Sequence, residues 1–69
     1  MKNDESIIIG AKIKQQRAIK GWTQKQLSDF LNISRGHLIK IERGSGNPTL
    51  KTILKLKDLF GCEYKNLLP

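Results

Sequence analysis

The sequence is poor in the residues that build disulfides, metal sites and membrane segments. It has one cysteine, Cys62, and one histidine, His37. One cysteine excludes an internal disulfide, and one cysteine with one histidine cannot supply the ligands of a Cys/His zinc site. The longest apolar run, Ile7–Ile9, is far shorter than a membrane span or a signal-peptide core. We therefore expect a small cytoplasmic protein with no metal, no cofactor, no small-molecule ligand and no membrane association.

Aromatic residues and catalytic groupings are also scarce. The four aromatic residues are not interleaved with basic ones, which argues against stacking on single-stranded nucleic acid. No acid pair, no nucleophile beside a base and no phosphate-binding loop is present. A chain of 69 residues forms at most one domain and has little room for a deep cleft. An enzyme is therefore the weakest interpretation.

Basic residues are abundant and unevenly placed. The chain carries 13 Lys and Arg against 6 Asp and Glu, a net charge of +7. All of this excess lies between Gly10 and Lys51, where Asp29 and Glu42 are the only acids, while the remaining segments are balanced. A basic middle with a neutral end predicts one surface for a polyanion and another for packing or self-association. Lysines that merely solvate exposed helices are the alternative.

The punctuation of the sequence predicts an all-α fold of five short helices. The first ends at Gly21, the second runs from Thr23 to Leu31, and the third follows Ser34 and stops at Gly44. Thr23-Gln24-Lys25-Gln26 fits a capping box. A fourth helix starts after Pro48 and Thr49 and is expected to bury Leu50, Ile53, Leu54, Leu56 and Phe60. The fifth is a helical turn or two within residues 63–68. Residues 1–6 are expected to be a flexible segment preceding a domain of residues 7–69.

The second and third helices are joined by a turn too short to let them lie antiparallel, so they must cross steeply. With Leu38 and Ile41 turned inward, the third helix presents a basic outer face. A helix of about 10–12 Å diameter fits the major groove of B-DNA, roughly 12 Å wide, where each base pair has a distinct donor and acceptor pattern. Arg35 has the forked donors that suit guanine, and Lys40 suits guanine or a phosphate.

Several sequence blocks resemble the phage-repressor helix-turn-helix family of the Cro/CI or XRE type. They are Gly21-Trp22-Thr23-Gln24, Ile41-Glu42-Arg43-Gly44 and Asn47-Pro48-Thr49-Leu50, and the likeness covers about residues 8–68. The resemblance implies a compact five-helix, lambda-repressor-like domain whose third helix reads the major groove. It also implies that Gln24 holds a phosphate and that Arg17 forms an ion pair with Glu42.

From the helix positions and the resemblance we predict two sets of DNA contacts. The base-contacting residues are Arg35, Gly36, Ile39 and Lys40. The phosphate-contacting residues are Thr23, Gln24, His37, Arg43, Ser45 and Asn47. Gly36 departs from the family, which often has a base-contacting side chain there. Either the backbone comes very close to the DNA at this position, or the position reads no base.

The sequence thus predicts a regulator of transcription, a repressor or an activator, that binds double-stranded DNA sequence-specifically at the nucleoid as a homodimer on a pseudo-palindromic operator. The predicted dimer interface is the neutral C-terminal end, with Leu59, Tyr64, Leu67 and Leu68. Two alternatives share the fold: an antitoxin and a controller of a restriction-modification system. A third is a protein-interaction module whose basic face is incidental and whose contacts are the apolar Phe30 and Ile39.

Overall fold

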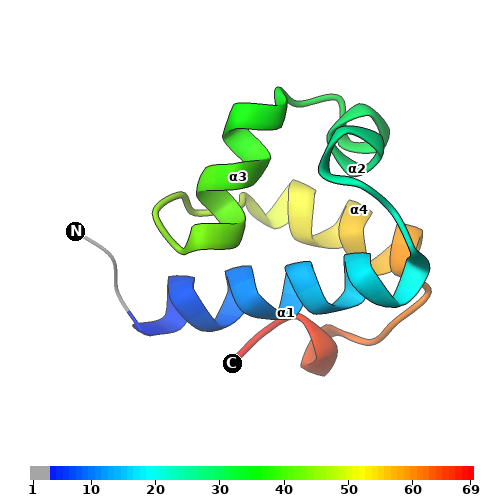
Figure 1. Cartoon of the computed structure of the whole chain (residues 1–69). Coiled ribbons are helices and arrows are strands. Elements are labelled where there is room, and N and C mark those ends of the chain that lie inside the picture. The colour runs from blue at the N-terminus through cyan, green and yellow to red at the C-terminus, as the bar shows by residue number, and fades with distance from the viewer. Residues whose placement is uncertain (1–3) are drawn as a thin grey trace.

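A computed structural model describes residues 4–69, which form four α-helices and one short 3₁₀ turn (Figure 1). The helices are α1 (Asp4–Lys20), α2 (Gln24–Leu31), α3 (Arg35–Arg43) and α4 (Leu50–Phe60). The all-α prediction is correct for this part of the chain, but the number of helices is not. The expected fifth helix is a single 3₁₀ turn, η1 (Tyr64–Asn66).

Side-chain caps and left-handed residues fix where the helices begin and end. Thr23 and Gln26 form the predicted capping box, in which the Thr23 hydroxyl accepts from the Gln26 N–H at 3.0 Å and the Gln26 side chain accepts from the Thr23 N–H at 2.9 Å. Ser34 caps α3 and Thr49 caps α4 with the hydroxyl alone, which accepts from the backbone N–H three residues later. Asn32 ends α2 with φ 56°, a left-handed conformation that asparagine tolerates better than most residues. The first three helices therefore stop where the sequence predicts.

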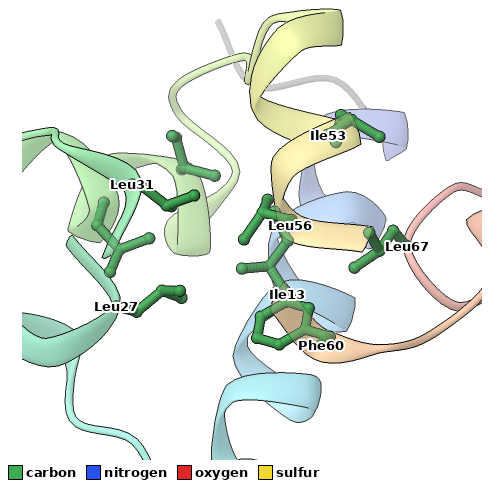
Figure 2. Packing of buried hydrophobic residues seen from close by; sticks show 9 residues of the cluster. Ile13, Leu27, Leu31, Ile53, Leu56, Phe60 and Leu67 are labelled. Atoms are coloured by element: carbon green, nitrogen blue, oxygen red, sulfur yellow. The ribbon is translucent and has the colours of Figure 1, made fainter. Parts of the chain in front are cut away.

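One hydrophobic core holds all four helices together (Figure 2). Its members are Ile13 from α1, Leu27 and Leu31 from α2, Leu38 and Ile41 from α3, Ile53, Leu56 and Phe60 from α4, and Leu67 beyond η1. Each of these side chains is less than a tenth exposed. The burial of apolar surface on this scale is the main force that folds a chain this small.

Backbone contact between α1 and α3 is the tightest feature of the fold. A side chain at Gly10 would collide with the Ile41 carbonyl oxygen and lie 2.8 Å from that of Glu42. Gly44, at φ 81°, ends α3 directly against the Ile7 backbone, where an added Cβ would lie 2.7 Å from the Ile7 Cα. Two glycines thus let α1 approach the second half of α3 and set the position of α3 on the domain.

The first residues of α1 depart from the expected flexible segment. Asp4, Glu5 and Ser6 form the first turn of α1, so the helix begins three residues before the expected domain boundary. Ser6 is 6% exposed and its hydroxyl donates to the Asn47 side chain in the loop after α3. Met1, Lys2 and Asn3 lie outside the described residues.

Two leucines of α4 are exposed, contrary to expectation. Leu50 is 74% exposed and Leu54 43% exposed, whereas Ile53, Leu56 and Phe60 are buried as predicted. An α-helix that packs on one side can bury only one stripe of its surface. Leu50 and Leu54 lie four residues apart at the solvent edge of that stripe.

The C-terminal segment folds back onto α1. Leu67 is fully buried, and the Lys12 ammonium donates to the carbonyl oxygens of Lys65 at 3.1 Å and Leu68 at 2.7 Å. These bonds satisfy one carbonyl within η1 and one just after it, and they tie the end of the chain to α1. The end of the chain therefore lies against the side of α1 away from α3 (Figure 1).

Candidate DNA-binding surface

The helix-turn-helix consists of α2, the turn Asn32–Ser34, and α3. The Asn32 N–H bonds back to the Ser28 and Asp29 carbonyls, and the Ser34 hydroxyl accepts from the His37 N–H at 3.0 Å. These bonds reverse the chain within three residues and start α3 at once. The steep crossing of α2 and α3 predicted from the short turn is visible in Figure 1.

The outer side of α3 carries exposed residues at helical spacing. Leu38 and Ile41 are buried on the inner side, while Gly36, Lys40 and Arg43 are exposed four and three residues apart. This spacing places the three in one row, which we call the outer ridge. Arg35 and His37 are exposed beside it, whereas Ile39 is half-buried. The structure therefore leaves Arg35, Gly36 and Lys40 accessible and Ile39 only partly so.

Four cations on this side of the molecule have no ion-pair partner among residues 4–69. Three ion pairs occur within residues 4–69, and none of them includes Lys14, Arg35, Lys40 or Arg43. Unpaired cations on an exposed helix attract phosphate and release counterions when DNA binds. The outer ridge and its surroundings thus have the charge that a DNA contact requires.

Beneath the ridge, Arg17 and Glu42 form the predicted ion pair between α1 and α3. The Arg17 Nε donates to Glu42 Oε2 at 2.7 Å and Nη2 donates to Oε1 at 3.1 Å. The Arg17 side chain is 14% exposed and that of Glu42 3%. Arg17 Nη1 also donates to the Trp22 carbonyl at 2.9 Å, so the guanidinium binds both the carboxylate and the chain before α2. A bidentate pair of this kind fixes geometry as well as charge.

Gln24 joins the same network from α2, which sequence reasoning did not predict. Its side-chain amide donates to Glu42 Oε1 at 3.2 Å. Glu42 thereby ties α1, α2 and α3 at one point. Gln24 is the first residue of α2, where backbone N–H groups lack helical acceptors, so its predicted phosphate contact remains available through the backbone.

The other predicted phosphate contacts are all exposed, but some side chains are already hydrogen-bonded. The Thr23 hydroxyl accepts the capping bond, the Ser45 hydroxyl donates to the Lys40 carbonyl at 3.2 Å, and the Asn47 side chain accepts from Ser6. His37 and Arg43 are exposed on α3 itself. The loop after α3 is thus held by short-range bonds and by the start of α1.

Two hollows beside α3 add lysines that the sequence did not single out. One is lined by Lys14, Gln24, Ile39, Glu42 and Arg43, the other by Arg17, Thr23, Gln24, Lys25 and Arg35. Lys14 precedes Arg17 by three residues, so both lie on one face of α1. That spacing could have predicted that Lys14 lies beside α3, because Arg17 was already expected to face α3.

The predicted dimer residues are not all on the surface. Leu67 is fully buried in the core of its own chain, so its assignment to an interface is wrong. Tyr64 and Leu68 are 40% and 36% exposed, and Leu59 is half-buried. The burial of Leu67 follows from the return of the chain to α1, which no local pattern encodes. Further exposed apolar surface is provided by Leu50 and Leu54 on α4.

The remaining chemistry of residues 4–69 is sparse. No cluster of three or more His, Cys, Asp or Glu side chains suited to a metal ion is found in this part of the chain. None of the helices described is long and apolar enough to cross a membrane.

Comparison with known sequences agrees with this geometry. The helix-turn-helix family profile matches residues 13–65. The chain belongs to the helix-turn-helix family. Its resemblance to phage-repressor proteins is confirmed by the immunity repressor protein of Bacillus phage phi105, which is 33% identical over 60 residues, 87% of this chain and 42% of the repressor. The chain is also similar to a Bacillus subtilis relative described as an SPbeta prophage-derived uncharacterized HTH-type transcriptional regulator, YonR. The two are 38% identical over 61 residues, which are 88% of this chain and 56% of the relative.

Solved structures of helix-turn-helix proteins have the same fold. The restriction-modification controller protein C.AhdI from Aeromonas hydrophila superposes with a TM-score of 0.82 at 28% identity, covering 91% of this chain and 96% of the controller. The biofilm regulator SinR, solved in complex with DNA, superposes with a TM-score of 0.76 at 28% identity, covering 86% of this chain and 95% of SinR. This helix-turn-helix chain is therefore of a type found in DNA-binding transcription regulators, which are not a class of enzyme.

Proposed function

We propose that this helix-turn-helix chain regulates transcription by binding double-stranded DNA in a sequence-specific way, with α3 in the major groove. The observation that carries the proposal is the outer ridge, an exposed basic row on the second helix of a helix-turn-helix. In this pose Arg35, Gly36, Lys40 and the accessible part of Ile39 face base edges. Arg35 supplies a fork for guanine O6 and N7. The site of action is the nucleoid in the cytoplasm.

Phosphate contacts hold the domain on either side of the groove. The residues proposed for them are Thr23, Gln24, His37, Arg43, Ser45 and Asn47, with Lys14 added from its hollow beside Arg43. Gln24 offers backbone N–H groups at the start of α2, and the lysine and arginines offer charge. These contacts set register and orientation, while the residues proposed to face base edges set sequence preference.

The binding unit is a two-fold homodimer on a pseudo-palindrome. The proposed interface is the exposed apolar surface of α4 and the C-terminal segment, made by Leu50, Leu54, Tyr64 and Leu68 with the half-buried Leu59. Lys57 lies over the Tyr64 ring, 5.1 Å from its centre, and continues the row of Leu50 and Leu54 along α4. The cation lies over one face of the Tyr64 ring, and Leu50 and Leu54 are 74% and 43% exposed.

The test of function is selection from random DNA duplexes, read by sequencing. We expect an enriched site with two inverted half-sites whose centres lie about one helical turn apart. Enrichment of a single half-site is consistent with base reading by α3 but rejects the two-fold dimer. No enriched sequence, with DNA binding that is uniform across duplexes, rejects sequence-specific regulation.

The test of the interface is the oligomeric state of Leu54→Asp, measured by sedimentation with and without DNA. We expect the dimer to be lost while the monomer stays folded, because Leu54 is 43% exposed and a charge there meets water. Ile19→Asp is the matched control, since Ile19 is 68% exposed but lies on α1 outside the proposed interface. Equal behaviour of the two variants rejects this interface.

A controller of a restriction-modification system is the second candidate. The likeness to C.AhdI at a TM-score of 0.82 favours it. Both candidates require the same DNA-binding surface. The genes adjacent to the coding sequence distinguish them, because a controller is encoded beside a nuclease and a methyltransferase.

A further inference from the structure

Gly36 occupies the first position of the outer ridge, and nothing among residues 4–69 requires a glycine there. Its backbone is helical, and it is absent from the positive-φ glycines, which are Gly21, Gly44 and Gly61. A Cβ added at Gly36 meets no atom within 4 Å, whereas one added at Gly10 collides with α3. Gly10 and Gly44 are explained by close packing of α1 on α3. Gly36 has no such explanation.

Gly36 is the second residue of α3, in its first turn, and a glycine in a helix is less favourable than alanine because it loses more backbone freedom on folding. The helix that carries it is only nine residues long. The same position is flanked by the two strongest base-contact candidates, Arg35 before it and Lys40 one turn later on the same row. The ridge therefore has a notch, one side chain deep, at the point where it would meet the base edges.

We infer that Gly36 is a specificity-determining residue whose notch receives the C5-methyl group of a thymine in the operator half-site. The inference rests on the proposed function and deepens it. The thymine methyl is the apolar group that projects from base pairs into the major groove. The glycine offers only C–H groups there, so the notch suits a methyl and provides no side-chain donor or acceptor for another base edge. Since Arg35 precedes Gly36 directly, this thymine lies next to the guanine that Arg35 reads.

The test exchanges one methyl group on each side of the interface. Each thymine of the selected half-site is replaced in turn by deoxyuridine, which lacks only the methyl, and affinities are measured for the wild type and Gly36→Ala. At one thymine beside the Arg35 guanine, we expect deoxyuridine to weaken wild-type binding about fourfold, the factor that burial of one methyl-sized group carries. Gly36→Ala should bind the thymine site at least tenfold more weakly, because two methyl groups then compete for one space.

The decisive result is the reversal of preference. Gly36→Ala should bind the deoxyuridine site better than the thymine site, since the alanine methyl then fills the notch from the protein side. Its thermal unfolding temperature should not fall, which separates the effect from misfolding. Gln15→Ala, an exposed substitution on α1, is the control and should keep the wild-type ratio.

Two results overturn the notch. One is that the wild type binds the thymine and deoxyuridine sites equally well at every position. The other is that the wild type and Gly36→Ala show the same ratio of thymine to deoxyuridine affinity. Neither result affects the proposed function, which requires only that the wild type selects a sequence. Failure of the selection itself is the separate outcome that rejects the function.

Discussion

Arg17 and Arg35 line the same hollow, yet the regions to which they belong use charge in opposite ways. Arg17 lies in the seam between α1 and α3, where both ends of its guanidinium are hydrogen-bonded within the protein. Arg35 stands at the start of α3, exposed and outside the three ion pairs of residues 4–69. A charge with partners in its own chain fixes structure, and a charge without them is available to bind. The comparison predicts that variants in the seam between α1 and α3 lose folding stability, and that variants on the exposed side of α3 lose affinity for DNA.

The largest expected effect is that of Glu42→Ala, because the Glu42 carboxylate accepts three hydrogen bonds, two from Arg17 and one from Gln24. The substitution leaves the Arg17 guanidinium, 14% exposed, without its carboxylate. We expect a loss of about 3–5 kcal/mol in the free energy of unfolding, measured by urea denaturation followed by circular dichroism. Lys25 and Asp29 form an exposed pair at 3.1 Å, and Asp29→Ala, the control, should cost less than about 1 kcal/mol. Similar losses for both variants would erase the distinction between seam and surface.

Alanine substitutions at two glycines, one in the seam and one on the exposed side of α3, should have opposite effects on stability. Gly10→Ala should destabilise the domain by about 1–3 kcal/mol, because the new methyl forces α1 away from α3. Gly36→Ala should instead stabilise it by up to about 1 kcal/mol, since its methyl meets nothing within 4 Å and alanine favours the helix. Both are read from urea denaturation curves. A stabilised Gly10→Ala would mean that the two helices are not in backbone contact.

Arg35→Ala tests the exposed side of α3 next to the outer ridge. We expect a loss of about 1–3 kcal/mol in binding to the selected operator and little change on unrelated DNA, because a guanine fork discriminates between bases. Unfolding should shift by no more than about 0.5 kcal/mol, as for other exposed substitutions. Fluorescence anisotropy with labelled duplexes measures the affinities. Equal losses on both DNAs would assign Arg35 to a phosphate.

The smallest expected effect concerns the salt dependence of Lys14→Ala. If Lys14 neutralises a phosphate, its removal should lower the slope of log K against log salt by about one. Lys65→Ala is the control, because Lys65 lies in the C-terminal segment beside Glu63. An unchanged slope for Lys14→Ala would remove Lys14 from the DNA contact.

Local patterns predicted the local features well. Thr23, Ser34 and Thr49 cap helices as expected because a capping hydroxyl and the N–H it binds lie within three residues of each other. The buried faces of α2 and α3 also follow from apolar spacing. The pairing of Arg17 with Glu42 came only from the family resemblance, since no local rule joins residues 25 positions apart.

The errors lie where burial depends on which surface another segment covers. The apolar positions of α4 are too many for one stripe, so periodicity could not tell that Ile53 is covered and Leu54 is not. Leu67 follows a segment without helical spacing, and its burial depends on the chain returning to α1. Gln24 could be placed at a helix start, but its bond to Glu42 needs the crossing of α2 and α3. The predicted base and phosphate contacts stay predictions, because they depend on a partner.

Trp22 gives the molecule an optical reporter of its own folding. It is the single tryptophan of the sequence, and its ring lies 5.0 Å from that of Phe30 on α2 and 5.9 Å from that of Phe60 on α4. Its indole emission therefore changes when these helices separate, with no dye attached. Because neither aromatic neighbour belongs to α3, the native intensity is expected to survive substitutions on the outer ridge. One spectrum can then certify that a variant with weakened DNA affinity is still folded.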